Sequence, residues 1–326
     1  IMRINDDNGF RINAIVKGAK AIQEYDGIIN SGKDCEKNIK GVGKSIGGRV
    51  DEIINTGTLA ELSCIEADDE GIETYLVENE AIKRQQKRNM VFIKALCRAH
   101  GMGPKRAKQY VDMGLKSFDD VIVAHNAGTI KVPAAILVGM EYADDCEERI
   151  PRFEIDTFKY MFEQIRDLCF PNLIFEISGS YRRGQSHSGD IDLLITDPNT
   201  NVSYLKEVKK VLYEHNIMVA DLTKEGTVKY MAICQVLEGM PCRRIDIRWI
   251  NYESFGPGLL YFTGSQEFNI WMRNYAIAKG FSLSEYGLKE DKETHEASDE
   301  QYIFDLMAIT YIPPYMRNKE FSIRWD

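Results

Sequence analysis

The sequence of 326 residues predicts an α+β fold, in which two helical subdomains precede a mixed sheet with helices and a small α+β C-terminal subdomain. Two glycine-containing turns, 41–43 and 101–103, each lie beside apolar residues at helical spacing. Farther along, the segments 190–195 and 243–250 have the apolar or alternating character of strands. The expected domains are residues 1–66, 67–150, 151–252 and 253–326.

Composition predicts a soluble, intracellular chain. It is 44% hydrophobic and 28% charged, with no charged-then-apolar leader at its start. No apolar run approaches the roughly 20 residues that span a bilayer, so no membrane partner is expected. The seven cysteines are an odd number without paired CxxC spacing, and we expect neither disulfides nor structural zinc.

The formal net charge of −9 argues against a partner made of phosphates, because Lys and Arg supply much of the affinity for nucleic acids. The charges are unevenly distributed, however. Basic residues concentrate at 83–88 and 104–108, and acidic residues at 66–80 and 285–300. We therefore expect a polarised surface with local basic patches.

The first 66 residues predict helices around a tight turn. Apolar residues at helical spacing occupy 12–16 and 46–54, and between them lie Gly41, Gly43 and Lys44. Two glycines allow close approach of the backbone, and the N–H groups at the start of the next helix suit a DNA phosphate. This plan resembles a helix-hairpin-helix, although an ordinary glycine turn would explain a single copy.

The plan occurs a second time, in residues 96–112. Gly101 and Gly103 repeat the two glycines, Pro104 suits the first helical turn, and Lys105 follows it. Two copies indicate a protein that grips two segments of a DNA strand. The acidic stretch 66–80 between them is expected to be a hinge.

Residues 151–252 predict a mixed sheet. Helical spacing at 153–168 and a helix at 204–215 alternate with strands, which are expected at 173–177, from 190, at 228–237 and at 243–250. The helices are expected to cover one face of this sheet, and carboxylates to occupy the other.

Three carboxylates form the candidate catalytic site. Asp190 and Asp192 are two apart on a strand, so they project to the same side and can share a pair of divalent cations. A lone Asp-x-Asp is more often a turn or a solvated strand edge. Here Asp246, flanked by Arg244 and Arg248 on the same face of a second strand, supplies a third carboxylate.

Groups that hold a polyphosphate lie directly upstream of the first two carboxylates. Backbone N–H groups, hydroxyls and guanidiniums of this kind bind phosphate oxygens. They belong to Gly179, Ser180, Arg182, Arg183, Ser188 and Gly189.

Gly179–Ser180 with Asp190-x-Asp192 is the nucleotidyltransferase signature, and the strand Arg-Arg-Ile-Asp-Ile-Arg together with Tyr261–Ser265 resembles family X DNA polymerases, the beta type in particular. The likeness covers nearly the whole chain. It implies a lyase-like helical domain that binds DNA ends, a second helix-hairpin-helix subdomain, a nucleotidyltransferase-type palm, and a C-terminal subdomain that binds the nascent base pair.

The resemblance also implies cofactors. Two Mg²⁺, with Mn²⁺ as a substitute, are expected at the carboxylates, with Asp190 and Asp192 bridging both ions and Asp246 binding one. Na⁺ or K⁺ is expected at backbone carbonyls of the two hairpins, namely those of Lys37, Ile39 and Val42 and of Cys97, Ala99 and Met102.

Substrate contacts follow from the same resemblance. The residues implied to bind the nucleotide are Arg149, Gly179, Ser180, Arg183, Ser188, Gly189, Tyr261, Phe262, Gly264 and Asn269. The residues implied to bind DNA are Gly41, Gly43, Lys44, Gly101, Gly103, Lys105, Arg244, Arg248 and Arg273. A cis peptide is expected between Gly264 and Ser265.

The chain departs from the family pattern at three informative positions. Gln266 replaces a common aspartate, and Ile270 replaces a lysine that stacks on the template. Arg49 stands where the family's lyase has its Schiff-base lysine, so no lyase nucleophile is assigned. The lysines that could substitute for it are Lys17, Lys20, Lys40 and Lys44.

The predicted function is template-directed addition of dNTPs to a primer 3′-hydroxyl, filling short gaps during base excision repair. The expected partners are gapped or nicked primer-template DNA and a dNTP, bound by a monomer that would be nuclear in a eukaryotic cell. One alternative is a template-independent nucleotidyltransferase, such as a terminal transferase or a tRNA-tailing or poly(A)-adding enzyme. The other is a non-catalytic scaffold for DNA ends.

Overall fold

The computed structural model describes residues 9–59, 84–224, 226–291 and 293–318. The predicted hinge at 66–80, the 66/67 boundary, Cys64 and Lys83 lie outside these ranges. The chain divides into two compact units, residues 1–91 and 92–326. Within the described ranges no helix is long and apolar enough to cross a membrane, and the six cysteines there are free.

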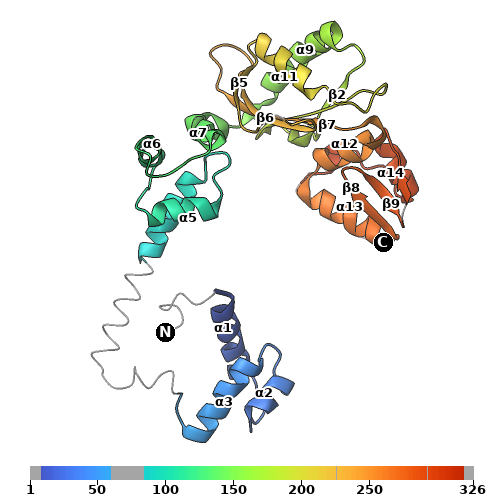
Figure 1. The fold of residues 1–326 in the computed structure, drawn as a ribbon. Coiled ribbons are helices and arrows are strands. Elements are labelled where there is room, and N and C mark those ends of the chain that lie inside the picture. The colour runs from blue at the N-terminus through green and yellow to red at the C-terminus, as the bar shows by residue number, and fades with distance from the viewer. Residues whose placement is uncertain (1–8, 60–83, 225, 292, 319–326) are drawn as a thin grey trace. The chain divides into compact units, whose positions relative to one another are not determined.

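The first unit contains three described helices, α1 (Gly9–Gln23), α2 (Gly32–Asn38) and α3 (Lys44–Thr56) (Figure 1). The hydroxyl of Ser31 caps α2 by accepting a hydrogen bond from the Asp34 N–H. Cys35, Ile39 and Val42 form a small core around the turn between α2 and α3. The predicted helix–turn–helix therefore forms as a packed pair.

The second helical part begins with a helix at residues 84–96. The helices that follow are α5 (Pro104–Asp112), α6 (Phe118–Asn126), α7 (Ala134–Glu141) and α8 (Ala143–Glu147). Leu96, Val121 and Ile136 are fully or almost fully buried in one apolar cluster that joins the helix at residues 84–96 with α5, α6 and α7. Ser117 and Asp120 form a reciprocal capping box at the start of α6.

A five-stranded mixed sheet follows. Its elements, in chain order, are α9 (Arg152–Cys169), β2 (Ile174–Ile177), α10 (Gly179–Arg182), β4 (Ile191–Thr196), α11 (Leu205–Glu214), β5 (Met218–Asp221), β6 (Lys229–Cys234) and β7 (Arg243–Trp249). The strand order is β2-β4-β7-β6-β5, with β4 and β7 parallel and the other neighbours antiparallel. The short strands β1 (Ile150–Pro151) and β3 (His187–Ser188) pair separately.

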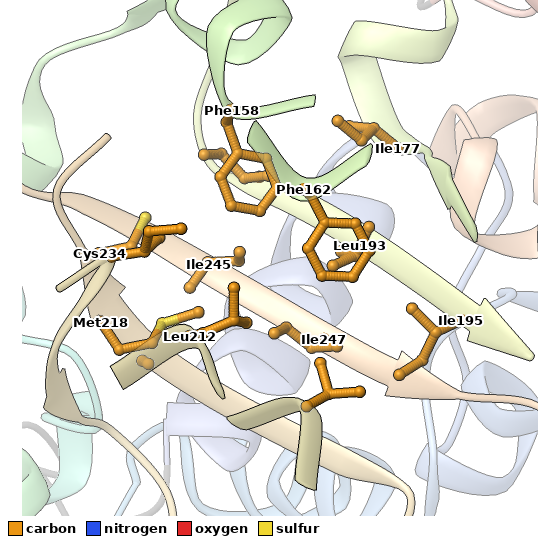
Figure 2. Close-up of a cluster of buried hydrophobic side chains, with 14 of the residues drawn as sticks. Phe158, Phe162, Ile177, Leu193, Ile195, Leu212, Met218, Cys234, Ile245 and Ile247 are labelled. Carbon is orange, nitrogen blue, oxygen red and sulfur yellow. The ribbon is translucent and has the colours of Figure 1, made fainter. Parts of the chain in front are cut away.

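Helices α9 and α11 cover one face of this sheet (Figure 1). Phe158 and Phe162 from α9 pack with Leu193 and Ile247 from the strands, as Figure 2 shows. Burial along β7 alternates strictly, which confirms the predicted strand with its isoleucines on the core side. The polar residues of β7 are consequently held on the opposite face.

The C-terminal part packs helices on a three-stranded antiparallel sheet of order β10-β9-β8. Its elements are η2 (Tyr252–Ser254), α12 (Phe255–Thr263), α13 (Gln266–Ala278), β8 (Phe281–Ser284), β9 (Gly287–Glu290), β10 (Glu293–His295), α14 (Glu300–Leu306) and η3 (Pro314–Met316). The Ser265 side chain caps α13 by accepting a hydrogen bond from the Phe268 N–H.

Helix α12 has glycine and proline in its first turn, residues that disfavour a helix. Packing explains one of them, because a Cβ on Gly256 would overlap the backbone of Asp299. The backbones of these two segments approach so closely that only glycine fits.

Candidate active site

The three predicted carboxylates lie at neighbouring positions on two adjacent strands. Strands β4 and β7 run parallel in a register that places Asp192 opposite Asp246. Asp190 immediately precedes β4. Since Leu193 and Ile247 point into the core, alternation places Asp192 and Asp246 on the open face of the sheet.

Each outer carboxylate contacts positive side chains. Arg244 Nη2 donates to Asp190 Oδ2. Asp246 Oδ2 lies 3.4 Å from Arg248 Nη2 and 3.6 Å from Lys229 Nζ. Lys229 comes from β6, which contains no motif, and sequence reasoning missed it.

The central carboxylate is electrostatically strained. Burial, followed by the neighbouring charges of Asp190 and Asp246, raises the pKa of Asp192 to about 7, although Arg244 and Arg248 oppose the shift. A carboxylate in this position is stabilised in its ionised form by added positive charge.

The carboxylates suit a divalent cation chemically. Asp246 Oδ1 is buried and has no hydrogen-bond partner among the described residues. Hard divalent cations such as Mg²⁺ prefer carboxylate oxygens of this kind. Within the described part of the chain no three His, Cys, Asp or Glu side chains already converge to hold a metal. Asp190 is in contact with Arg244, and Asp246 with Lys229 and Arg248.

Gly179 brings the loop that is predicted to bind phosphate against Asp192. Its φ is +59°, and a Cβ at this position would overlap Asp192 Oδ2. The adjacent Ser178 N–H donates to the Asp192 carbonyl at 2.8 Å, which fastens the loop to β4. Glycine is required at 179 because the backbone approaches the carboxylate so closely.

The hydroxyl and guanidinium groups of this loop are held by local contacts. Ser180 Oγ lies 2.9 Å from Ser188 Oγ. Arg149 Nη2 donates to the His187 carbonyl at 3.0 Å, and a Cβ on Gly189 would lie 3.6 Å from Arg149 Nη1. Arg149 directly precedes β1, Gly189 directly follows β3, and Ser180 belongs to α10, so these groups gather at one end of the site.

Arg183 links this loop to the C-terminal part of the chain. Its Nη1 donates to the Thr263 carbonyl, and its Nε donates to Asn318 Oδ1 at 3.3 Å. Gln185 Nε2 donates to the same Asn318 oxygen at 2.8 Å. Burial lowers the pKa of Arg183, and the carboxylates of Asp192 and Glu267 oppose the shift.

A cleft of about 1270 Å³ joins these groups. Predicted site residues that line it are Arg149, Gly179, Ser180, Arg183, Gly189, Asp190, Asp192, Asp246, Arg248, Tyr261, Phe262, Gly264, Asn269 and Arg273. Ser188, buried beneath Ser180, and Arg244 do not line it. Lining residues without a predicted role are Gln185, Ser265, Gln266, Glu267, Ile270 and Asn318. Of these, Gln266 and Ile270 could have been singled out from the sequence, because both depart from the family pattern.

The opposite wall of the cleft is aromatic and cationic. The rings of Tyr261 and Phe262 meet edge to face at 4.9 Å. Arg273 lies 5.0 Å from the first ring centroid and Arg248 lies 4.5 Å from the second. Asn269 Nδ2 donates to the Tyr261 carbonyl at 2.7 Å. The expected cis peptide between Gly264 and Ser265 is present.

The two predicted hairpins share one backbone geometry. Gly41 and Gly101 have φ of +99° and +78°. One residue later, the Val42 N–H donates to the Ile39 carbonyl at 3.2 Å, and the Met102 N–H donates to the Ala99 carbonyl at 3.1 Å. Helices then begin at Lys44 and Pro104.

Open backbone is a further property of these turns. A Cβ added to Gly41, Gly43 or Gly103 would meet nothing within 4 Å. The neighbouring Lys44 and Lys105 are exposed at the starts of their helices. Cation binding by the carbonyls of residues 37–42 and 97–102 stays a prediction.

Comparison with known proteins adds family matches to this geometry. Residues 149–252 match the DNA polymerase beta palm, residues 258–318 the DNA polymerase beta thumb, and residues 1–59 a helix-hairpin-helix domain. The chain is 26% identical over 310 residues to DNA polymerase lambda of Arabidopsis thaliana, covering 87% of this chain and 54% of the relative. It is 28% identical over 284 residues to DNA polymerase lambda of Rattus norvegicus, covering 85% and 44%.

DNA polymerase IV of Saccharomyces cerevisiae is 23% identical over 398 residues, with 97% of this chain and 64% of the yeast protein covered. The chain spans about half the length of the two lambda relatives, 54% and 44%. In chain order the matches are a helix-hairpin-helix, a palm and a thumb, and they agree with the first turn, with the carboxylates and with the loop predicted to bind phosphate. The chain therefore belongs to the family X DNA polymerases and is similar to the beta and lambda types.

Proposed function

We propose that the protein is a template-directed DNA polymerase that adds dNTPs to a primer 3′-hydroxyl. The observation that carries this proposal is a single cleft that combines three carboxylates with arginine and hydroxyl groups suited to a triphosphate. Asp190 and Asp192 would each hold two metal ions, and Asp246 would hold one. When bound, two Mg²⁺, or Mn²⁺ in their place, activate the primer hydroxyl and neutralise charge on the triphosphate and pyrophosphate.

The chain's own residues position the reactants. Ser180, Arg183 and Arg149 would bind the β- and γ-phosphates, together with Ser188 and the backbone of Gly189. Tyr261 and Phe262 would support the sugar of the incoming nucleotide. Phosphoryl transfer needs little covalent chemistry from the protein, so alignment and charge neutralisation provide the catalysis.

A templated substrate is favoured over a template-independent one. Asn269 and Arg273 line the cleft beside Tyr261, where they could contact a nascent base pair. The two turns with open backbone offer N–H groups and lysines to two DNA segments. These features suit gapped or nicked primer-template DNA, as in short-gap filling during base excision repair. In a eukaryotic cell such a substrate lies in the nucleus.

The test is extension of a primer across a one-nucleotide gap, with and without template. Asp192→Ala and Asp246→Ala should each lower the rate of extension about a hundredfold or more. The reason is that charge developing in the transition state is then no longer stabilised by a preorganised site. Asp167→Ala, an exposed carboxylate on α9, is the matched control and should match the parent. Extension by either active-site variant at the parental rate, or equal incorporation without template, would contradict the proposal.

We also propose that the first unit binds a gapped 5′-end without acting as a lyase. Arg49 Nη1 donates to the Ser45 hydroxyl and carbonyl at 2.8 and 3.0 Å. A guanidinium of this kind suits a phosphate but cannot supply the primary amine for a Schiff base. The hairpin carbonyls of Lys37, Ile39 and Val42, and of their counterparts in residues 97–102, would hold Na⁺ or K⁺ beside the DNA.

A further inference from the structure

Lys229 is the first residue of β6 and reaches a catalytic carboxylate across the sheet. In the antiparallel register, Lys229 pairs with Arg248 and Met231 pairs with Asp246. Lys229 is therefore a diagonal neighbour of Asp246 on the same face. Its Nζ lies 3.6 Å from Asp246 Oδ2, and the two side chains are 39% and 13% exposed.

The contacts of Asp246 are divided unequally between its two oxygens. Lys229 and Arg248 both approach Oδ2, at 3.6 and 3.4 Å. Oδ1 is buried and has no hydrogen-bond partner among the described residues. The cationic side chains of Lys229 and Arg248, from two strands, thus fix the rotation of the Asp246 carboxylate through Oδ2 and leave Oδ1 available.

The surroundings of Lys229 contain further charged and titratable groups. Arg244 lies on β7 and donates to Asp190 rather than to Asp246. From the second hairpin, His100 faces the same region. Burial, and then the charges of Arg244 and Lys229, lower its pKa and so disfavour the imidazolium, although the charge of Asp246 opposes the shift. Lys229 and Arg248 therefore supply the positive charge that contacts Asp246.

We infer that Lys229 is a positioning residue for the polymerase reaction, because its ammonium holds Asp246 in the orientation that presents Oδ1 to the metal site. This inference rests on the proposed function. Removal of the ammonium is then expected to have opposite effects on the rate of the chemical step and on the affinity for a divalent cation. Without the ammonium, the carboxylate is less well oriented and the chemical step slows. At the same time, a competing positive charge disappears and a divalent cation binds more tightly.

The experiment compares Lys229→Met, Lys229→Gln and Lys229→Arg in the full chain. Lys210→Met is the matched control, since Lys210 is an exposed lysine on α11 that pairs with Glu214. Single-turnover incorporation gives the rate constant kpol and the Kd for dNTP. Binding of Mn²⁺ is measured by electron paramagnetic resonance on a complex with a dideoxy-terminated primer, which cannot react. Thermal melting verifies that each variant folds.

For Lys229→Met we expect kpol to fall about tenfold, with the Kd for dNTP unchanged. The half-saturating Mn²⁺ concentration should fall about two- to fivefold, as expected for removal of one partly exposed ion pair. Lys229→Gln should behave like Lys229→Met, because it also lacks the charge. Lys229→Arg should restore most of kpol, and the control should match the parent.

Three results would overturn the inference. One is an unchanged kpol with weaker DNA binding, which would make Lys229 a DNA contact. Another is a reduced kpol with weaker Mn²⁺ binding, which would contradict the expected loss of a competing positive charge. The third is identical behaviour of parent and variant. If the parent itself fails to incorporate nucleotides, the proposed function fails, and the Mn²⁺ measurement still tests Lys229 separately.

Discussion

At the scale of single residues, Gly179 joins backbone geometry to chemistry. Its positive φ turns the chain from β2 into α10, and its missing side chain leaves room for the Asp192 carboxylate. The sequence motif identifies this glycine. It does not reveal that the missing side chain makes room for the carboxylate of Asp192. Steric demand and the proposed metal chemistry therefore meet at one position.

Gly179→Ala should impair both catalysis and folding. The new Cβ would displace Asp192, and alanine is strained at this φ, so we expect about 1–3 kcal/mol of destabilisation together with at least about a tenfold loss of kpol. Gly239→Ala is the matched control, since Gly239 has φ of +82° but open space around its Cβ position. Chemical denaturation and single-turnover extension provide the two measurements.

The control separates strain from displacement of the carboxylate. Gly239→Ala should be destabilised by backbone strain and should keep the parental kpol. Equal kpol values for Gly179→Ala and the parent would show that Asp192 tolerates the extra carbon.

At the scale of elements, charged side chains fasten helix α10, which is proposed to bind phosphate, to the C-terminal part. Arg182, which ends α10, donates to Glu300 Oε2 at 2.9 Å and to Thr263 Oγ1 at 2.8 Å. Arg317 donates to Glu300 Oε1 at 2.6 Å, and these two side chains are 0% and 3% exposed. Residues far apart in sequence therefore hold one end of the cleft in place.

The pKa of Glu300, the carboxylate that both arginines contact, is shifted by its surroundings. Burial by itself raises the pKa of Glu300, but the arginines at 317 and 182 more than offset this, so the net pKa lies below the ordinary value of 4.5. A depressed carboxyl pKa contributes stability that is present above the ordinary value and is lost as pH falls through the lowered value.

Glu300→Gln should therefore be strongly destabilising near neutral pH and less so in acid. Leaving the buried Arg317 and the partly buried Arg182 without their carboxylate should cost about 3–5 kcal/mol. Denaturation at pH 7 and at pH values below 4.5 measures the difference from the parent, which should shrink as the parental Glu300 is protonated. Glu296→Gln, an exposed neighbour, is the control and should change little. A deficit that stays constant down to the lowest pH would contradict this account.

At the scale of the whole molecule, two units share one turn geometry while the chain as a whole is acidic. The net charge of −9 opposes DNA in general, so binding must come from local groups. Lys44 and Lys105, at the starts of two helices with open glycine backbone beside them, are such groups. Distribution of charge, rather than its sum, decides which surface can meet DNA.

The Arg49 substitution predicts that the chain forms no covalent adduct with a 5′-deoxyribose phosphate. Borohydride trapping on an incised abasic substrate should give no crosslink, because the guanidinium cannot form a reducible imine. Arg49→Lys should give a detectable crosslink by restoring a primary amine. A tetrahydrofuran analogue, which has no aldehyde, is the negative control. Strong trapping by the parent would refute the prediction, and mass spectrometry would then locate the lysine, starting with Lys17, Lys20, Lys40 and Lys44.

Much of the fold followed from local patterns. Helical spacing at 153–168 predicted α9, and alternation at 243–250 predicted β7 with Arg244, Asp246 and Arg248 on one face. Periodicity identified these elements because each buries one face against a single core. It did not predict α12, whose glycines contradict helix propensity, although close packing against Asp299 explains Gly256.

By itself, the sequence determined the kinds of groups at the site, because chemistry requires particular side chains at particular spacings. Asp190, Asp192 and Asp246 could be identified in this way, as could the repeated glycine turns. Only the tertiary structure decided which groups contact one another, such as Lys229 with Asp246 or Arg183 with Asn318. Those contacts depend on the register between strands and on the packing of segments distant in sequence, and neither leaves a local pattern in the chain.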